Sequence, residues 1–301
     1  MTTTIRPSEA RTGKELSSVG TPAVRVDGAE KVSGAARFVD DLEFGPDLLY
    51  AEIVESPCGN ARILDIDTSA AEAVPGVIKV VTGSDFPYRF GLYMKDRFIF
   101  AQDRVRFVGE QVAAVIARDP KVAMRAAKLV RVTYEELAPI LDPLEALESD
   151  APLIHPGLDE YEHVPWFFPQ RDSNIAHWRK IRKGDLEAGF AEADLVLEGE
   201  YRVPRYAHCA IEPHAIVGLY DHSGRLTLWS ASQSPYIQRH LFAEALAPLG
   251  LTHKDVRVIS PYVGGGFGGK AGVSMEIMGA ALATAVKGHP IKVRFTREQE
   301  F

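Results

Sequence analysis

The stretch Val263-Gly-Gly-Gly-Phe-Gly-Gly-Lys270 lies between a run of residues typical of a strand and a run typical of a helix. Its five glycines remove nearly every Cβ atom, so the main chain can turn sharply and present its N–H groups to a ligand. A helix that begins soon afterwards would add the partial positive charge of its N-terminus. This glycine loop, residues 264–270, therefore predicts a site for an anion or for strongly hydrogen-bonding oxygen atoms.

A second loop, Ser230-Ala-Ser-Gln-Ser234, also follows an expected strand and precedes an expected helix that begins at Pro235. The side-chain amide of Gln233 can donate to an oxygen atom while its carbonyl accepts from a neighbour. The two loops could converge on one oxygen-rich cofactor. Taken alone, Gln233 is more typical of a local capping residue.

The apolar periodicity outside these loops predicts an α+β fold. Strands are expected at residues 49–54, 62–67, 77–81, 105–117 with a break at Gly109, 130–134, 195–201, 215–220, 226–230, 256–259 and 291–295. Helices are expected after Ser69 and at residues 120–129, 186–193, 235–247 and 273–286. The last of these is apolar on almost every face, which indicates that it is buried.

Changes in these patterns suggest the domain boundaries. Residues 1–18 are expected to be a disordered lead-in, 19–145 a first α+β domain, 146–175 a linker and 176–301 a second, incomplete domain. The linker carries the aromatic cluster Trp166-Phe167-Phe168. Such a cluster is more typical of a clamp that holds a linker on a domain than of a ligand site.

The composition narrows the classes of function. The 301 residues have a net charge of −7 and no basic stripe, which argues against nucleic acid as the main partner. Cys58 and Cys209 are the only cysteines, too few for an iron–sulfur cluster or a disulfide framework, so a reducing, cytoplasmic compartment is expected. Neither a signal-peptide pattern nor an apolar run of about 20 residues is present to cross a membrane.

Two other interpretations of the glycine loop remain open. Gly264, Gly269 and Lys270 match the G-x-x-x-x-G-K part of a phosphate-binding loop, whose next residue should be Ser or Thr to bind Mg²⁺. That residue is Ala271, so a nucleotide-binding protein is a less favoured alternative. The glycines could also serve tight packing alone.

His208, Glu212 and His214 form a possible metal-binding group. The first two are four residues apart, which would pair them on a helix, but Pro213 and the β-rich flanks argue against a helix there. A further set of zinc-type ligands is missing. Hydrogen bonding within the protein is therefore favoured over a metal site for these three side chains.

Together these features resemble the molybdenum hydroxylase family, the molybdopterin-binding large subunits of xanthine dehydrogenase, aldehyde oxidase and their relatives. The resemblance extends from about Val19 onward and lies in an ordered series of motifs. Residues 25–34, 56–63, 108–113 and 134–137 resemble the N-terminal hammerhead domain, and residues 184–185, 208–213, 232–233 and 264–270 resemble the first part of the cofactor domain. Any one motif alone would be weak.

The resemblance implies a molybdenum ion held by a pterin, in a dinucleotide form, rather than by protein side chains. It implies oxidation of an aldehyde or N-heteroaromatic substrate with water as the source of oxygen. By the family pattern, Gln233 would hydrogen-bond an oxo ligand, and Phe267 would contact the cofactor and form a wall of the substrate pocket. Gly265, Gly266, Gly268 and Gly269 complete the expected cofactor-binding set.

The resemblance also implies partners. A 2Fe-2S cluster and FAD are expected on an iron–sulfur subunit and an FAD subunit, and a second molybdopterin subunit could complete the cofactor domain. The family's general-base glutamate lies beyond Phe301, so this chain is expected to be inactive by itself, as a fragment or as a naturally split subunit. Purine-oxidising members carry Glu where this chain has Ala271, which argues against xanthine as a substrate. An aromatic thioester reductase and a non-catalytic assembly subunit are the alternatives within the family.

Overall fold

The computed structural model describes residues 22–301, and the expected lead-in at residues 1–18 lies outside this range. The chain divides into two compact units, one ending at Arg37 and one covering Phe38–Phe301. In the first unit, helix α1 (Gly28–Ser33) ends at Gly34, whose φ of 76° is the left-handed conformation that favours glycine. The Lys31 ammonium lies 2.6 Å from the Asp27 carboxylate, one turn away.

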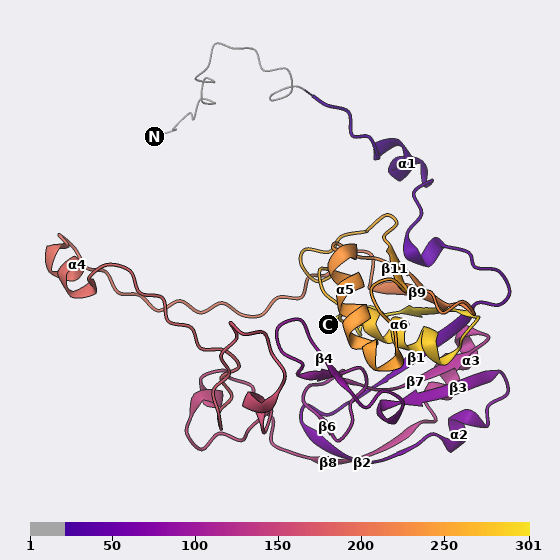
Figure 1. Cartoon of the computed structure of the whole chain (residues 1–301), viewed down its shortest axis with the longest axis horizontal. Coiled ribbons are helices and arrows are strands. Elements are labelled where there is room, and N and C mark those ends of the chain that lie inside the picture. Colours follow the sequence, from indigo (N-terminus) through magenta and orange to yellow (C-terminus); the bar gives the residue numbers. More distant parts are fainter. Residues whose placement is uncertain (1–21) are drawn as a thin grey trace, which may run out of the picture. The chain divides into compact units, whose positions relative to one another are not determined.

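The second unit is built on a mixed sheet with the strand order β11-β10-β9-β12-β1-β7-β3 (Figure 1). These strands are β1 (Leu49–Glu55), β3 (Val77–Thr82), β7 (Gln111–Ala117), β9 (Ala215–Tyr220), β10 (Leu226–Ser230), β11 (Val256–Ile259) and β12 (Pro290–Arg294). β1 and β12 pair in parallel, with Leu49 opposite Ile291 and Ala51 opposite Val293. One continuous sheet therefore contains strands from both sides of the expected 146–175 linker, and the division into domains at that linker stays a prediction.

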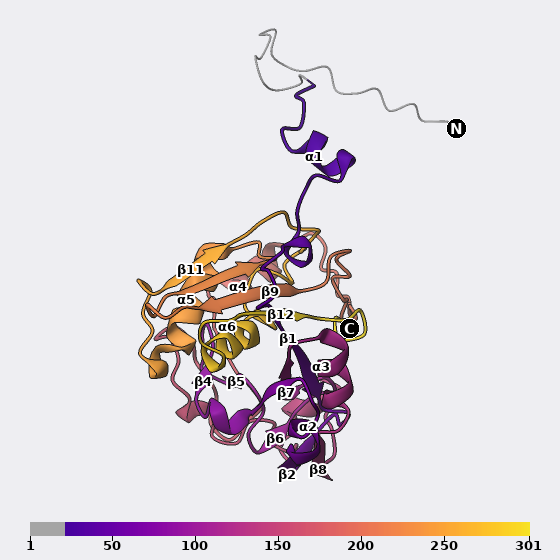
Figure 2. The same ribbon diagram turned by 90° about the vertical axis from the view of Figure 1, so that its right-hand side faces the viewer.

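Helices cover both faces of this sheet because its strands bury side chains on both. α5 (Pro235–Ala245) and α6 (Glu276–Ala285) share one core with Ile116, Ile216 and Ile291. α2 (Ser69–Glu72) and α3 (Pro120–Ala127) pack on the other face, against Val80 and Val115. Figure 2 shows α6 beside β9 and β12, and α3 beside β1 and β7.

Smaller elements complete this unit. A second sheet has the order β6-β2-β8, and β4 pairs with β5. The bounds are β2 (Ala61–Asp67), β4 (Arg89–Phe90), β5 (Arg97–Phe98), β6 (Arg104–Val105), β8 (Arg131–Glu136) and α4 (Leu186–Glu192), and the short 3-10 helices are η1 (Val39–Asp41), η2 (Gly83–Asp85), η3 (Glu145–Leu147), η4 (Leu158–Glu160) and η5 (Ala247–Leu249). The predicted α+β class is confirmed, as are the expected strands apart from that at 195–201, although the break expected at Gly109 extends over residues 106–110 between β6 and β7.

The exception is the strand expected at residues 195–201, which does not form. These residues belong to an extended segment, residues 178–206, which we call the arm and which carries α4 (Figure 1). A strand needs a neighbour to accept its ladder of hydrogen bonds, and no described residue pairs with this segment. The arm leaves these large apolar side chains exposed: Trp178, Ile181, Leu186, Phe190, Leu195, Val196, Leu197, Tyr201, Val203 and Tyr206.

The aromatic cluster at residues 166–168 holds the linker on the first part of the unit. Phe167 stacks on Tyr93, with ring centroids 6.2 Å apart, and on His177 at 4.6 Å. The Val164 N–H donates to the Tyr93 carbonyl, and the main chain of Lys95 pairs with that of Glu162. The cluster thus has the contacts of a clamp, as its sequence suggested.

Candidate functional site

The glycine loop turns sharply between β11 and α6. Gly265, Phe267 and Gly268 have φ values of 101°, 54° and 99°. These values lie in a region of backbone conformation that residues other than glycine rarely adopt. Phe267 adopts it nonetheless, with 73% of its surface exposed. A bulky residue held in this conformation indicates a local constraint of the kind found at ligand sites.

Several glycines of the loop are required by close packing. A Cβ atom at Gly264 would lie 2.5 Å from the Glu212 Cβ, and one at Gly266 would lie 2.4 Å from the Gln233 Oε1. A Cβ at Gly269 would lie 3.0 Å from the His208 ring. Packing alone therefore explains these glycines, but it does not explain the exposed Phe267 between them.

Gln233 fixes one side of the loop with its carbonyl end. Its Oε1 accepts from the N–H of Gly268 at 3.0 Å and from the N–H of Lys270 at 3.3 Å. Its main-chain N–H donates to the Lys270 carbonyl at 3.0 Å. The side-chain amide nitrogen of Gln233 donates to no group in residues 22–301, so it is available to an oxygen atom of a ligand.

Three consecutive main-chain donors of the loop are also free. Within the described part of the chain, the N–H groups of Gly265, Gly266 and Phe267 form no hydrogen bond with a protein group. The sequence predicts cofactor contacts at Gly268 and Gly269 as well, but their N–H groups donate to Gln233 and to the Gly266 carbonyl. The free donors and the Gln233 amide fit a ligand rich in oxygen atoms, such as a pterin-bound metal centre.

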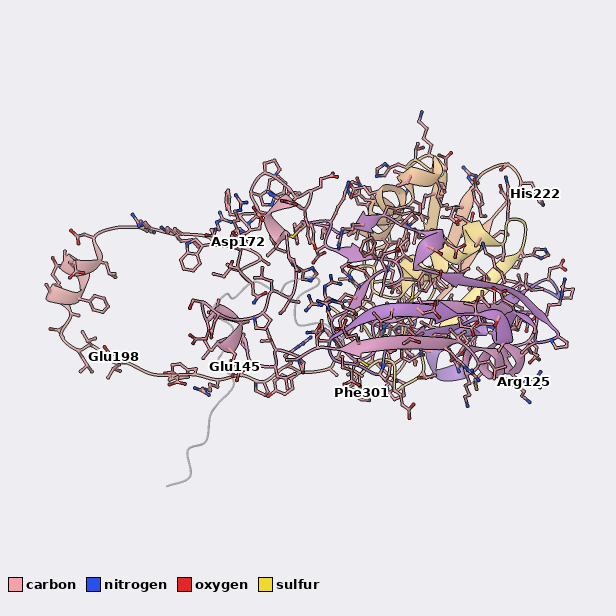
Figure 3. The ribbon with its side chains drawn as sticks, turned by 90° about the horizontal axis from the view of Figure 1, so that it is seen from below. Arg125, Glu145, Asp172, Glu198, His222 and Phe301 are labelled. Atoms are coloured by element: carbon pink, nitrogen blue, oxygen red, sulfur yellow. The ribbon has the colours of Figure 1, made fainter. Side chains whose placement is uncertain are left out.

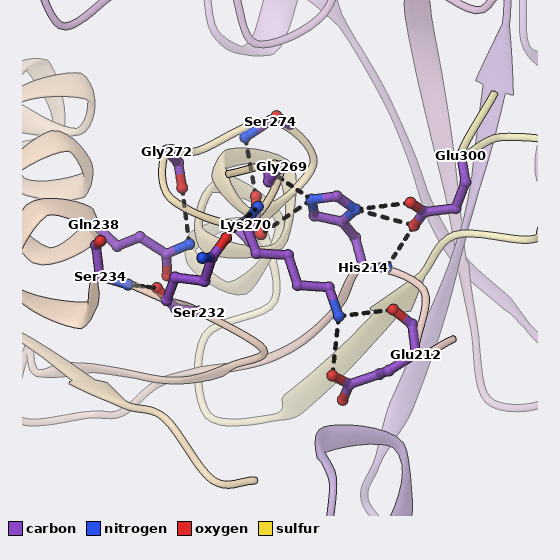
Figure 4. Close-up of polar contacts among 12 residues, drawn as sticks. Glu212, His214, Ser232, Ser234, Gln238, Gly269, Lys270, Gly272, Ser274 and Glu300 are labelled. Atoms are coloured by element: carbon purple, nitrogen blue, oxygen red, sulfur yellow. Dashed lines mark hydrogen bonds and ion pairs between the residues drawn. The ribbon is translucent and has the colours of Figure 1, made fainter. Parts of the chain in front are cut away.

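Beneath the loop, Lys270 forms a buried ion pair with Glu212 (Figure 4). Only 1% of Lys270 is exposed. Its Nζ donates to the Glu212 Oε2 at 2.9 Å and to the Glu212 main-chain carbonyl at 2.7 Å, and the same Oε2 accepts from the Gly264 N–H at 2.7 Å. The ammonium group is thus engaged within the protein. This is contrary to the nucleotide-binding alternative, in which the loop lysine contacts the phosphates of the nucleotide.

His214 joins the loop to the end of the chain (Figure 4). Its Nδ1 lies 2.9 Å from the Glu300 Oε1 and its Nε2 lies 3.1 Å from the Gly269 carbonyl oxygen. Glu276, fully buried at the start of α6, lies 3.8 Å from the same Nε2. Burial raises the pKa of Glu276, while the nearby His214 charge opposes that rise.

The metal-binding candidates are accounted for by these contacts. Glu212 pairs with Lys270 and His214 with Glu300 and Gly269, whereas His208 packs against the glycine loop. Within residues 22–301, no group of three or more His, Cys, Asp or Glu side chains is placed to hold a metal ion. The structure thus gives these residues contacts with protein groups.

Family models match two parts of the chain. Residues 33–138 match the aldehyde oxidase and xanthine dehydrogenase a/b hammerhead domain, and residues 167–301 match the molybdopterin cofactor-binding domain, which contains the glycine loop and Gln233. The chain belongs to the molybdenum hydroxylase family. The family match confirms the resemblance seen in the ordered motifs, including the hammerhead and cofactor-domain order.

Known members of the molybdenum hydroxylase family align with almost the whole chain. The nicotinate dehydrogenase large molybdopterin subunit of Eubacterium barkeri is 36% identical over 95% of this chain and 63% of its own length. The carbon monoxide dehydrogenase large chain of Afipia carboxidovorans is 32% identical over 96% of this chain and 36% of its own length. The crystal structure of quinoline 2-oxidoreductase from Pseudomonas putida superposes with a TM-score of 0.80 at 29% identity, over 93% of this chain and 35% of that one. The chain therefore spans between about one-third and two-thirds of these relatives.

The helix after the glycine loop begins later than expected. α6 starts at Glu276 rather than near Val273, and the Ser274 N–H donates to the Glu276 carboxylate at 2.9 Å. This carboxylate occupies the N-terminal end of the helix, so the dipole of α6 is directed at Glu276 rather than at a ligand. The expected burial of this helix is confirmed.

Three charged residues, Lys270, Glu276 and Glu300, form polar contacts around the glycine loop. None of these contacts was predicted from the sequence. An acidic residue at the start of an otherwise apolar helix was a usable signal for Glu276, because a buried carboxylate needs a partner. Glu300 had no such signal, since it contacts His214 across 86 residues of sequence.

Proposed function

We propose that this chain forms part of the molybdenum-cofactor site of a multi-subunit hydroxylase that oxidises an aldehyde or an N-heteroaromatic compound. The observation that carries the proposal is the row of free N–H groups at Gly265, Gly266 and Phe267, beside the free amide of Gln233. The cofactor, when bound, supplies the oxidising centre. The residues of this chain hold its oxygen atoms by preorganised donors, and the exposed Phe267 ring forms one wall of the substrate pocket.

The substrate class follows from the residue after the loop lysine. Ala271 offers no charged or hydrogen-bonding side chain to a purine, so xanthine does not fit this site. The named activities of the relatives, on nicotinate, quinoline and carbon monoxide, support a small substrate. We favour an aldehyde or an N-heterocycle, with thioester reduction as the alternative.

The partners proposed are an iron–sulfur subunit with a 2Fe-2S cluster, an FAD subunit and a second molybdopterin-binding chain or segment that supplies the general base. The arm supports the last of these. Its residues 195–203 carry the exposed apolar side chains Leu195, Val196, Leu197, Tyr201 and Val203 on a main chain that pairs with no described residue. Such a segment, seen as an extended ribbon around Glu198 in Figure 3, suits the addition of a neighbouring strand. A dinucleotide form of the pterin and a reducing, cytoplasmic compartment complete the proposal. In residues 22–301, no helix is long and apolar enough to cross a membrane.

Metal analysis of the purified complex tests this function. We expect molybdenum in stoichiometric amount, and a complex that contains none in any active preparation would contradict the proposal. Gln233→Ala is expected to lower kcat at least tenfold, since it removes a hydrogen bond of about 1.4 kcal/mol to the centre and also the two bonds that Oε1 accepts from the loop. Gln170→Ala, which changes an exposed glutamine of the linker, is the control and should leave kcat unchanged.

The assembly-subunit alternative gives a different result with the same complex. If the chain binds partners but no cofactor, an active complex should tolerate both Gln233→Ala and Gly268→Val. The second change would place a branched side chain at a φ of 99°, which strongly disfavours the present loop conformation. If both variants retain full activity and molybdenum content, the cofactor is bound by another chain of the complex.

A further inference from the structure

His214 lies where three segments of the chain meet. It follows Glu212 and Pro213 directly before β9, and its ring contacts the glycine loop through Gly269 and the C-terminal segment through Glu300. The segments are also joined by the main chain, because the Phe295 N–H donates to the His214 carbonyl. Arg297 adds a hydrogen bond of 2.9 Å to the Ile211 carbonyl.

Both ring nitrogens of His214 face acceptors. Nδ1 lies 2.9 and 3.1 Å from the two carboxylate oxygens of Glu300, and Nε2 lies 3.1 Å from the Gly269 carbonyl. With Nε2 protonated, the ring donates to the Gly269 carbonyl. The Glu300 carboxylate also accepts from the His214 main-chain N–H, so Glu300 contacts both the ring and the main chain of His214.

Acidic side chains surround the ring on two sides. Glu300 on the C-terminal segment and Glu276 on α6 face it, at 2.9 and 3.8 Å. Lys270, on the loop, is already paired with Glu212. The Glu276 Oε1 has no hydrogen-bond partner among the described residues, and it lies 3.8 Å from the His214 Nε2.

The contact at Gly269 controls the shape of the loop. Gly269 receives the His214 hydrogen bond on its carbonyl, and its N–H donates to the Gly266 carbonyl at 2.8 Å. This second bond closes the turn from Gly266 to Gly269, whose first two N–H groups form no hydrogen bond within the described residues. A shift of the Gly269 peptide would therefore move the donors directly.

We propose that His214 is a positioning residue, oriented by its contact with Glu300, that fixes the Gly269 carbonyl and so sets the direction of the loop's free N–H donors. The role of those donors toward the cofactor rests on the proposed function. The contact of the ring with the Gly269 carbonyl does not, so the two parts can be tested separately.

The first test reads the ring itself in the full chain without cofactor. With ¹⁵N-labelled histidine, NMR should show the His214 Nε2 protonated and its hydrogen protected from exchange with solvent, assigned by loss of the signal in His214→Gln. In Glu300→Gln, the new amide still reaches Nδ1, so we expect the protected Nε2 hydrogen to remain. An Nε2 without a proton, or one whose hydrogen exchanges as fast as that of the exposed His222, would overturn the proposal.

The second test compares two replacements in the assembled complex. The side-chain amide of His214→Gln can reach the position of Nε2 and donate to Gly269, whereas that of His214→Asn reaches only the position of Nδ1. We expect both variants to lower the unfolding midpoint similarly. Molybdenum content and the Mo(V) EPR spectrum should be nearly retained in His214→Gln, while His214→Asn should hold about tenfold less metal.

Equal metal content and identical spectra in the two variants, at equal loss of stability, would reduce His214 to a structural residue and overturn the positioning role. His222→Gln, in the exposed turn between β9 and β10, is the control. If His214→Asn fails to fold, His214→Phe takes its place, because a phenyl ring keeps the bulk of the imidazole without a donor to the Gly269 carbonyl. Metal content and a spectrum equal to those of His214→Gln would then contradict the proposal. If the unaltered complex contains no molybdenum, the proposed function is wrong. The NMR result on the His214 ring would still hold, because it does not depend on the cofactor.

Discussion

Lys270→Met is expected to lower the free energy of unfolding by about 3–5 kcal/mol, because it leaves the Glu212 carboxylate without its cation in a buried setting. Lys270 is 1% exposed, and its Nζ makes two hydrogen bonds to Glu212. The Glu212 Oε1 already lacks a partner among the described residues. Denaturant unfolding of the chain, followed by fluorescence and circular dichroism, would measure the loss.

Two further variants define the cause of this effect. In Lys270→Met combined with Glu212→Gln, the buried charge is removed while an acceptor for the Gly264 N–H remains, so most of the loss should be recovered. Lys95→Met breaks an ion pair of similar length, 2.7 Å to Glu162, at the surface, and should cost no more than about 1 kcal/mol. If Lys270→Met costs no more than Lys95→Met, the buried pair has no special role in stability.

Gly266→Ala is expected to lower kcat of the assembled enzyme roughly 100-fold, the size of effect that a displacement of about 1 Å at a reacting site can have. The new Cβ would lie 2.4 to 2.7 Å from three atoms of the Gln233 side chain. Gln233 must then move, and its hydrogen bonds to the Gly268 and Lys270 N–H groups break. Steady-state kinetics together with molybdenum analysis would show whether the cofactor is lost or only misplaced.

Gly272→Ala is the matched control for this substitution. A Cβ at Gly272 meets no atom within 4 Å, although the residue lies only six positions further along the chain. It should leave kcat and metal content within about twofold of the unaltered enzyme, as expected for a substitution that makes no clash. If Gly266→Ala and Gly272→Ala lose similar amounts of kcat and metal, the glycine-rich segment tolerates no side chain at either position. The loss in Gly266→Ala could then not be attributed to displacement of Gln233.

Much of the fold could be predicted from local pattern. Strands β9, β10 and β11 have the bounds expected from their apolar residues, and α4 forms within the expected range 186–193. Asp185 caps it by accepting from the Ala188 N–H, an interaction between neighbours in sequence. The turn at Gly109, with a φ of 90°, was indicated by the glycine itself. These features depend on residues close together in sequence, which is why the sequence alone predicts them.

The rest depends on contacts that local pattern does not encode. Residues 195–201 begin with the apolar run Leu195-Val-Leu197 that favours a strand, but a strand exists only where another chain segment pairs with it. The start of α6 moved from near Val273 to Glu276, because the carboxylate of Glu276 binds the Ser274 N–H. For the site, the loop and Gln233 were found from the sequence, whereas the Glu212–Lys270 and His214–Glu300 pairs span 58 and 86 residues.

The parallel pairing of β1 with β12 has a consequence for how the chain is synthesised. β1 is translated about 240 residues before the strand that lies beside it, so the nascent polypeptide carries an open edge during most of its elongation on the ribosome. Long-range pairing of this kind forms slowly, and an unprotected edge invites association with other chains. We expect overproduction to yield insoluble material unless translation is slowed or a chaperone shields that edge. Comparing the soluble fraction of the chain with and without co-expression of a trigger-factor-type holdase would test this.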